Sequence, residues 1–263
     1  AEPTPTNFAM TLRQASALAL LAQLLALPAA TAFAPAAACC SQPLLCATRR
    51  SAPAIAADPF DVPRPDAERL VSAKSDDDQK LWLAGIGTVT VVSTALLVSA
   101  LSLLEGLLPD GWFAAVGNAN AVPLGLLFAA IGVAHFTAKE MFIGIVPPKG
   151  TWGGLWQVPS PGADELGLSY AEYHTYWTGA AEMGGGLLLA ASGVGLVPIA
   201  AQRLAAFLLL LLTAAVTPAN VYMFTHDAQM GGQAPPMKYP DSHVVRGVLQ
   251  VVLLADFWKL ALH

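Results

Sequence analysis

Residues 81–104 read LWLAGIGTVTVVSTALLVSALSLL, a run of 24 residues without a charged side chain. As an α-helix this run is longer than the roughly 30 Å hydrocarbon layer of a bilayer, because each residue adds about 1.5 Å. The whole chain has the same character. Of its 263 residues, 55% are hydrophobic and only 12% are charged, against roughly 25% charged residues in a soluble domain. The sequence therefore predicts an integral membrane protein with a transmembrane helix at 81–108.

Residues 121–263 contain four further apolar segments, separated by proline, glycine and polar residues. Pro147 and Pro148 end the first segment, because a residue that precedes proline disfavours the helical conformation. Ser169 and Glu172 have the spacing of a capping box, which predicts that a helix begins there. The expected helices span residues 121–146, 169–192, 198–226 and 242–261. We therefore predict an all-α membrane protein, with a four-helix transmembrane bundle and one extra N-terminal transmembrane helix.

The first 57 residues have the composition of a targeting sequence. After Met10, an apolar run at 15–27 is followed by small residues that a signal peptidase accepts. No acidic residue then occurs before Asp58, which is typical of an organelle transit peptide. Where the two segments meet, residues 30–35 read ATAFAP and resemble the ASAFAP motif of proteins sent into red-lineage secondary plastids. We expect a signal peptide and a plastid transit peptide at 1–57, and a plastid membrane location. The alternative is another transmembrane helix followed by a linker.

Residues 58–80 are polar and are expected to form a flexible lead-in. With five spans, this lead-in shares one side of the membrane with the loops at 147–168 and 227–241. Six Lys or Arg residues lie on that side and two on the other, so the positive-inside rule places the lead-in in the stroma. Trp152 and Trp156 favour the headgroup level, and we expect their loop to lie on the membrane surface.

Composition and motifs exclude several kinds of chemistry. The three cysteines, Cys39, Cys40 and Cys46, all precede Asp58, so the mature chain is expected to lack disulfides and thiolate ligands. The net charge is −5 and the basic residues are scattered singly, so we expect no nucleic-acid partner. The sequence has no HExxH helix, no paired ExxH motif and no glycine-rich phosphate loop. We therefore expect no metal site.

Polar side chains inside the predicted helices are the candidates for a binding site. Glu182 lies near the middle of its helix, and an intramembrane acid is costly unless it has a partner or carries a proton. Tyr222 and His226 share a helix face one turn apart, just after Pro218, which weakens the backbone hydrogen bonding. We expect five residues to line one polar cavity inside the bundle: His135, Glu182, Asn220, Tyr222 and His226. The alternative is that these side chains only form hydrogen bonds between helices.

Four short stretches carry a family resemblance: GVAHF at 132–136, IVPP at 145–148, GAAEMGG at 179–185 and PANVYM at 218–223. Together they make residues 125–261 resemble the DoxX-like family of small four-helix membrane proteins. The resemblance implies a DoxX-like bundle at 121–263, and it matches four residues to polar sites characteristic of the family: His135, Glu182, Asn220 and Tyr222. Some members of the family are linked to membrane redox complexes, and one relative is a subunit of a thiosulfate:quinone oxidoreductase. The extra helix and the tryptophan-containing loop depart from the family pattern.

The resemblance implies an accessory membrane subunit that binds a quinone or a similar lipophilic redox molecule in the polar cavity. One alternative is an assembly or pigment-associated subunit of a photosynthetic complex, in which His135 or His174 is an axial ligand of chlorophyll. Another is an isomerase of a membrane lipid, with Glu182 and His135 as acid and base. The expected partners are membrane lipids and either a membrane oxidoreductase or a photosynthetic complex.

Overall fold

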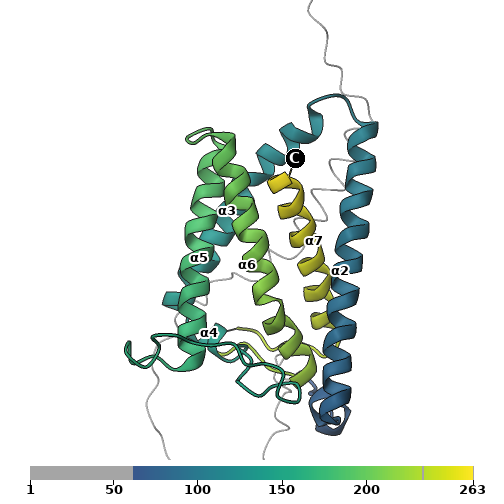
Figure 1. Ribbon diagram of the computed structural model, residues 1–263, viewed down its shortest axis with the longest axis vertical. Helices are drawn as coiled ribbons and strands as arrows, with labels where there is room; N and C mark the ends of the chain where they lie inside the picture. The colour runs from purple at the N-terminus through teal and green to yellow at the C-terminus, as the bar shows by residue number, and fades with distance from the viewer. Residues whose placement is uncertain (1–61, 233, 263) are drawn as a thin grey trace, which may run out of the picture. The chain divides into compact units, whose positions relative to one another are not determined.

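The computed structural model describes residues 62–232 and 234–262, and within these ranges it contains helices and loops but no strand. The predicted all-α class is confirmed. The targeting sequence predicted at 1–57 lies outside the described residues. Two 3-10 turns and six α-helices follow one another (Figure 1): η1 (Ala67–Arg69), η2 (Val71–Ala73), α2 (Asp76–Leu107), α3 (Trp112–Thr137), α4 (Glu140–Ile143), α5 (Tyr170–Gly193), α6 (Ile199–His226) and α7 (Asp241–Leu262).

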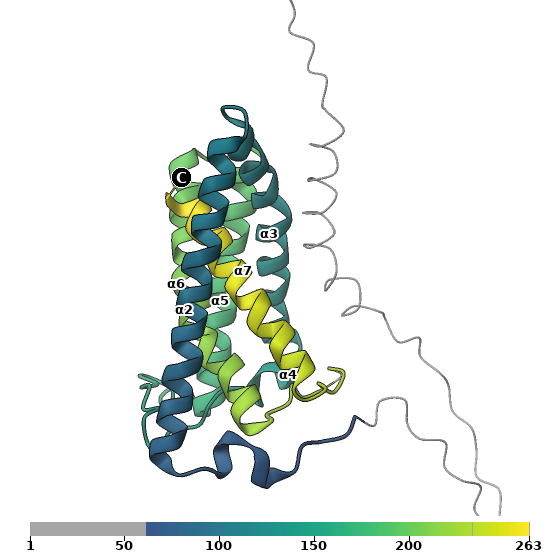
Figure 2. The same cartoon turned by 90° about the vertical axis from the view of Figure 1, so that its right-hand side faces the viewer.

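Three of these helices are long and apolar enough to cross a membrane, namely α2, α3 and α6. Helices α5 and α7 have 24 and 22 residues and run alongside them (Figure 2). The start of α2, helix α4 and the loops at 144–169 and 227–240 gather at one end of the helices, which we call the loop end (Figure 1). The turns at 108–111 and 194–198 lie at the opposite end, together with the end of α7.

Helix α2 begins at Asp76, five residues before the predicted span, because Ser75 caps it. The Ser75 hydroxyl accepts a hydrogen bond from the backbone N–H of Asp78 at 3.3 Å. Asp76, Asp77 and Asp78 occupy the first turn, where the helix dipole favours negative charge. Some residues before α2 contact the helices, and the flexibility predicted for 58–80 stays a prediction. Val71 is buried, and η2 contacts both α2 and α6.

Helix α3 differs at both ends from the helix predicted at 121–146. It begins at Trp112, after Gly111 in the left-handed conformation. Asn118 lies within the helix, ahead of the predicted start, and its amide oxygen accepts a hydrogen bond from Gln202 at 2.9 Å. The helix ends at Thr137, where Ala138 leaves the helical conformation with φ −135° and ψ 43°, and the short α4 follows.

The capping box predicted the start of α5 correctly. The Ser169 hydroxyl accepts the backbone N–H of Glu172 at 3.2 Å, and the Glu172 carboxylate accepts the backbone N–H of Ser169 at 3.1 Å. Two orphan N–H groups at the helix start are thereby satisfied. At the same end, Lys139 Nζ lies 2.7 Å from Glu172 Oε1 and ties the end of α3 to α5.

Helices α3 and α5 approach each other through glycines. A Cβ atom added to Gly186 would lie 2.5 Å from Ala129 N and from Gly125 O on α3. About two helical turns closer to the loop end, Gly132 of α3 and Gly179 of α5 meet in the same way. Small residues at these positions let the two backbones pack closely, which is the usual way for membrane helices to associate.

Helix α2 packs against α7. Lys259 Nζ on α7 lies 2.6 Å from Glu105 Oε2 on α2, so an ion pair joins the helices near the end opposite the loops. Large apolar side chains of α2 are exposed along its length, from Leu81 to Leu107. This exposed apolar surface matches the composition expected of a helix in contact with lipid.

Candidate functional site

His135 and Glu182 meet between α3 and α5. His135 Nδ1 lies 3.4 Å from Glu182 Oε2, and both side chains are about nine-tenths buried. The contact exists because Gly179, on the same face of α5 as Glu182, leaves room for the Cβ of His135. The imidazole also stacks on Phe142 of α4, with ring centroids 3.7 Å apart. The two strongest candidates from the sequence therefore lie together.

The hydrogen bonds of His135 determine its tautomer. Nδ1 lies 2.9 Å from the carbonyl oxygen of Ile131. A carbonyl oxygen can only accept, so Nδ1 must carry the hydrogen. In the neutral imidazole Nε2 then carries a lone pair and can accept a hydrogen bond or bind a metal. Because Nδ1–H is directed to Ile131, the buried Oε2 of Glu182 has no hydrogen-bond partner among the described residues.

Tyr222 and His226 belong to an aromatic cluster at the loop end of α6. Their rings lie 4.6 Å apart, and Trp152 contacts both edge-on. The Thr225 hydroxyl donates to the carbonyl of Val221 and accepts from Trp152 Nε1 at 3.0 Å. His226 Nδ1 also lies within hydrogen-bond distance of the same oxygen, at 2.8 Å.

Trp152 packs inside the protein, although its loop was expected to place its tryptophans at the headgroup level; the position of the loop on the membrane surface stays a prediction. Its side chain is only 1% exposed and fills the loop end of the bundle. The hydrogen bond from Trp152 to Thr225 joins residues 73 positions apart. No local pattern in the sequence signals such a contact.

Asn220 takes part in a third group of polar side chains, between α6 and α7. Its amide donates to Gln250 Oε1 at 2.9 Å, and its oxygen accepts from Arg246 Nη2 at 2.6 Å. Gln250 in turn donates to the Thr217 hydroxyl and to the carbonyl of Thr213. Sequence reasoning missed these partners. The spacing of Arg246 and Gln250, four residues apart on one helix face, was the available signal.

The five predicted residues thus fall into three groups. Asn220 and Tyr222 are two residues apart on α6, about 200° around the helix, so they serve different neighbours. Within the described part of the chain, His135 contacts Glu182 but has no hydrogen bond to the aromatic cluster or to the α6–α7 group. Hydrogen bonds and ring contacts therefore do not join the five residues into one network, and the single polar cavity stays a prediction.

His174 lies on the same face of α5 as Glu182, closer to the loop end. Trp177 Nε1 donates to His174 Nδ1 at 2.9 Å, and an indole can only donate, so the neutral imidazole carries its hydrogen on Nε2. That Nε2 is buried without a partner among the described residues, as is the hydroxyl of Thr175. Helix α5 therefore presents several polar atoms that an additional group could satisfy.

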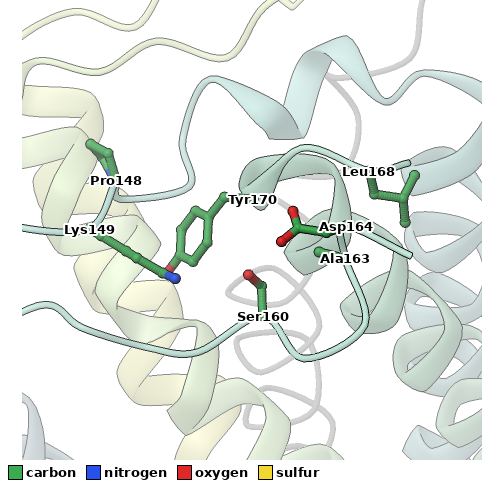
Figure 3. A pocket seen from close by; sticks show the side chains of 7 residues that line it. All are labelled: Pro148, Lys149, Ser160, Ala163, Asp164, Leu168 and Tyr170. Carbon is green, nitrogen blue, oxygen red and sulfur yellow. The ribbon is translucent and has the colours of Figure 1, made fainter. Parts of the chain in front are cut away.

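A surface pocket of about 320 Å³ lies in the loop between α4 and α5. Figure 3 shows Lys149, Ser160, Asp164 and Tyr170 around it. Lys149 Nζ lies 5.2 Å from the centre of the Tyr170 ring, and the Tyr170 hydroxyl accepts from Trp156 Nε1 at 3.0 Å. The pocket mixes both charges and does not include any of the five predicted residues. Within the residues that the structure describes, no group of three His, Cys, Asp or Glu side chains is placed to hold a metal ion.

These features define an all-helical protein with three helices apolar enough to cross a membrane. The chain belongs to the family described as Domain of unknown function (DUF8561), whose model matches residues 124–261, just over half of the chain. The matched range begins within α3 and ends in α7, so it contains His135, Glu182 and the α6–α7 group. Comparisons with curated proteins and with solved structures find no match.

Proposed function

We propose that this protein is a multi-pass plastid membrane protein that holds a quinone or a similar lipophilic redox molecule beside His135 and Glu182, as an accessory subunit of a membrane oxidoreductase. In this proposal α3, α5, α6 and α7 form a DoxX-like four-helix transmembrane bundle, and α2 is an additional span. The lengths of the helices support five spans. The shortest, α7, has 22 residues and reaches about 33 Å at 1.5 Å per residue.

The observation that carries the proposal is the unpaired Oε2 of Glu182 next to His135. A buried polar atom without a hydrogen bond costs about 1–3 kcal/mol, so its natural complement is a ligand group that bonds to it. The hydroxyl of a quinol can donate to a carboxylate oxygen, and a protonated carboxyl group can donate to a quinone carbonyl. Nε2 of His135 offers a second acceptor to the same ligand.

Aromatic side chains near the pair support a flat ring as the ligand. One face of His135 is covered by Phe142, and on the outer side of the same helices Phe136 and Tyr176 stack with centroids 5.4 Å apart. Offset stacking on such rings stabilises a planar ligand by about 0.5–1.5 kcal/mol per pair. In this account the protein's residues bind and orient the ring and exchange protons with it. The electrons belong to the ligand and to the partner oxidoreductase.

The pigment-associated alternative depends on which histidine can bind a metal through Nε2. His135 has its hydrogen on Nδ1, so its Nε2 lone pair is available. His174 has the opposite tautomer, because Trp177 donates to Nδ1. The hydrogen bonds therefore favour His135 over His174 as an axial ligand of chlorophyll. This alternative competes with a quinone for the same nitrogen.

Identification of the co-purified ligand tests the proposal. The native protein is purified in mild detergent, its absorption spectrum is recorded, and its lipid extract is compared with an extract of the whole membrane. We expect a quinone to be enriched relative to the membrane, at close to one molecule per chain. Stoichiometric chlorophyll would favour the pigment-associated alternative, and an extract with the composition of the bulk membrane would contradict both.

A further inference from the structure

Arg246, in the second turn of α7, is a cation between helices that has no acidic partner in the described part of the chain. Its Nε and Nη2 donate to Asn220 Oδ1 at 3.2 and 2.6 Å, and its Nη1 lies 3.9 Å from the sulfur of Met230. Among the described residues no carboxylate oxygen lies within 4.0 Å of the guanidinium. These neutral acceptors satisfy some of its N–H groups but do not balance its charge.

Two other charged side chains of the helices and their loops have a partner of opposite charge. Lys259 lies 2.6 Å from Glu105, and Asp227 lies 2.7 Å from Arg64. A charge removed from water is strongly unfavourable unless an opposite charge accompanies it. Arg246 therefore lacks a counter-charge that these other groups have.

His243 gives a second, independent indication at the same place. It lies three residues before Arg246 on the same face of α7, and both of its ring nitrogens are buried without a hydrogen-bond partner among the described residues. A neutral imidazole always carries one N–H, so a donor is left unsatisfied. The nearest acid is Asp227, whose Oδ1 is 4.0 Å away. That carboxylate already bonds to Arg64 and Gln229.

The faces of α7 that do not carry Arg246 are apolar at this end of the helix. Val244, Val245 and Val248 are each more than half exposed. They lie at the loop end of the helix, where a membrane helix meets the lipid headgroups. An oxyanion of the phosphate type matches the unbalanced charge of Arg246, because guanidinium groups bind phosphate oxygens in pairs.

We propose that Arg246 and His243 bind an oxyanion of the phosphate type between α6 and α7, supplied by the headgroup of an acidic lipid or by free phosphate. The oxyanion accepts from the N–H groups of Arg246 that Asn220 does not use and from the unpaired N–H of His243, and it neutralises the guanidinium. This site lies on different helices from the His135–Glu182 pair. It does not depend on the function proposed for that pair.

Thermal unfolding of the purified full chain in a neutral detergent tests this site. Phosphatidylglycerol, phosphatidylcholine and inorganic phosphate are titrated separately into wild-type protein and into three variants. Arg246→Gln removes the cation. Asn220→Asp places an internal carboxylate where the Arg246 guanidinium already bonds, and it keeps the size of the side chain. Lys238→Gln is the control, since it removes one exposed charge in the loop just before α7.

For the wild type we expect phosphatidylglycerol to raise the melting temperature by about 5 °C when present at about 100 times its dissociation constant, while phosphatidylcholine has little effect. An equal rise with inorganic phosphate supports the oxyanion site and assigns it to the free anion. Lys238→Gln should respond like the wild type, and Asn220→Asp should fold and lose most of the response. If Arg246→Gln does not fold, Asn220→Asp decides the question. Equal responses to both lipids, or a full response in Asn220→Asp, would overturn the proposal.

Discussion

Substitution of Gly186 by alanine should force α3 and α5 apart. The new Cβ would lie 2.5 Å from Ala129 N and from Gly125 O, whereas ordinary contacts of a Cβ fall at 3.4–4 Å. Both obstructing atoms are backbone atoms, so no rotamer change can make room. The helices must separate by about 1 Å, and overpacking of this kind costs about 1–3 kcal/mol. Because the alanine also raises helix propensity by up to about 1 kcal/mol, we expect a net destabilisation of about 1–2 kcal/mol.

Gly184→Ala is the matched control on the same helix. Gly184 is exposed and a Cβ there would have no neighbour within 4 Å. This variant gains the same helix propensity without a steric cost, so its free energy of unfolding should stay equal or rise. Both variants are unfolded by heat and by sodium dodecyl sulfate in the same lipid–detergent mixture. Equal stability of the two variants would refute the close glycine contact between α3 and α5.

Three further predictions concern the loop end of the protein. Trp152→Phe should destabilise the protein by about 1–3 kcal/mol, because it removes a buried hydrogen bond to Thr225; unchanged thermal unfolding would contradict this. The hydrogen bond to Glu172 raises the pKa of Lys139. The stability from this pair is therefore fully present below the ordinary lysine pKa and is lost as the pH rises through the raised pKa. Melting curves of wild type and Lys139→Met should therefore converge in strong alkali. Protease added at the stromal face of intact membranes should cleave within 58–80, and protection of that segment would reverse the orientation.

Helix positions were predictable wherever a local signal set them. The Ser169 and Glu172 spacing located the start of α5, because both members of a capping box lie within four residues of chain. The end of α6 at His226 also agrees with the prediction. The start of α3 was missed, since Asn118 and Asn120 resemble turn residues by themselves. In the folded chain they bond to Gln202 and Asp256, which no local window contains.

The residues of the candidate site could be predicted from the sequence, but the contacts between them could not. Glu182 and His135 could be chosen because polar groups are rare and costly in apolar helices. Their contact depends on glycines that let α3 and α5 approach each other. The sequence shows that these residues are small, but it does not show which helix they contact. Arg246 lies within the helix predicted at 242–261. Its partner Asn220 lies on the preceding helix, so the pairing appears only after the helices are placed.

The central claim is that Glu182 and His135 bind a ligand, and ligand retention in Glu182→Gln tests it most directly. Asp256→Asn is the matched control, because Asp256 is another partly buried acid, on α7, and bonds to Asn120 in the first half of α3, about four turns from His135. Each variant is purified like the wild type, and its bound quinone is extracted and counted per folded chain. We predict that Glu182→Gln inserts and folds but loses the ligand, while Asp256→Asn retains it. Full retention in Glu182→Gln would contradict the claim and leave the pair as a contact between two helices.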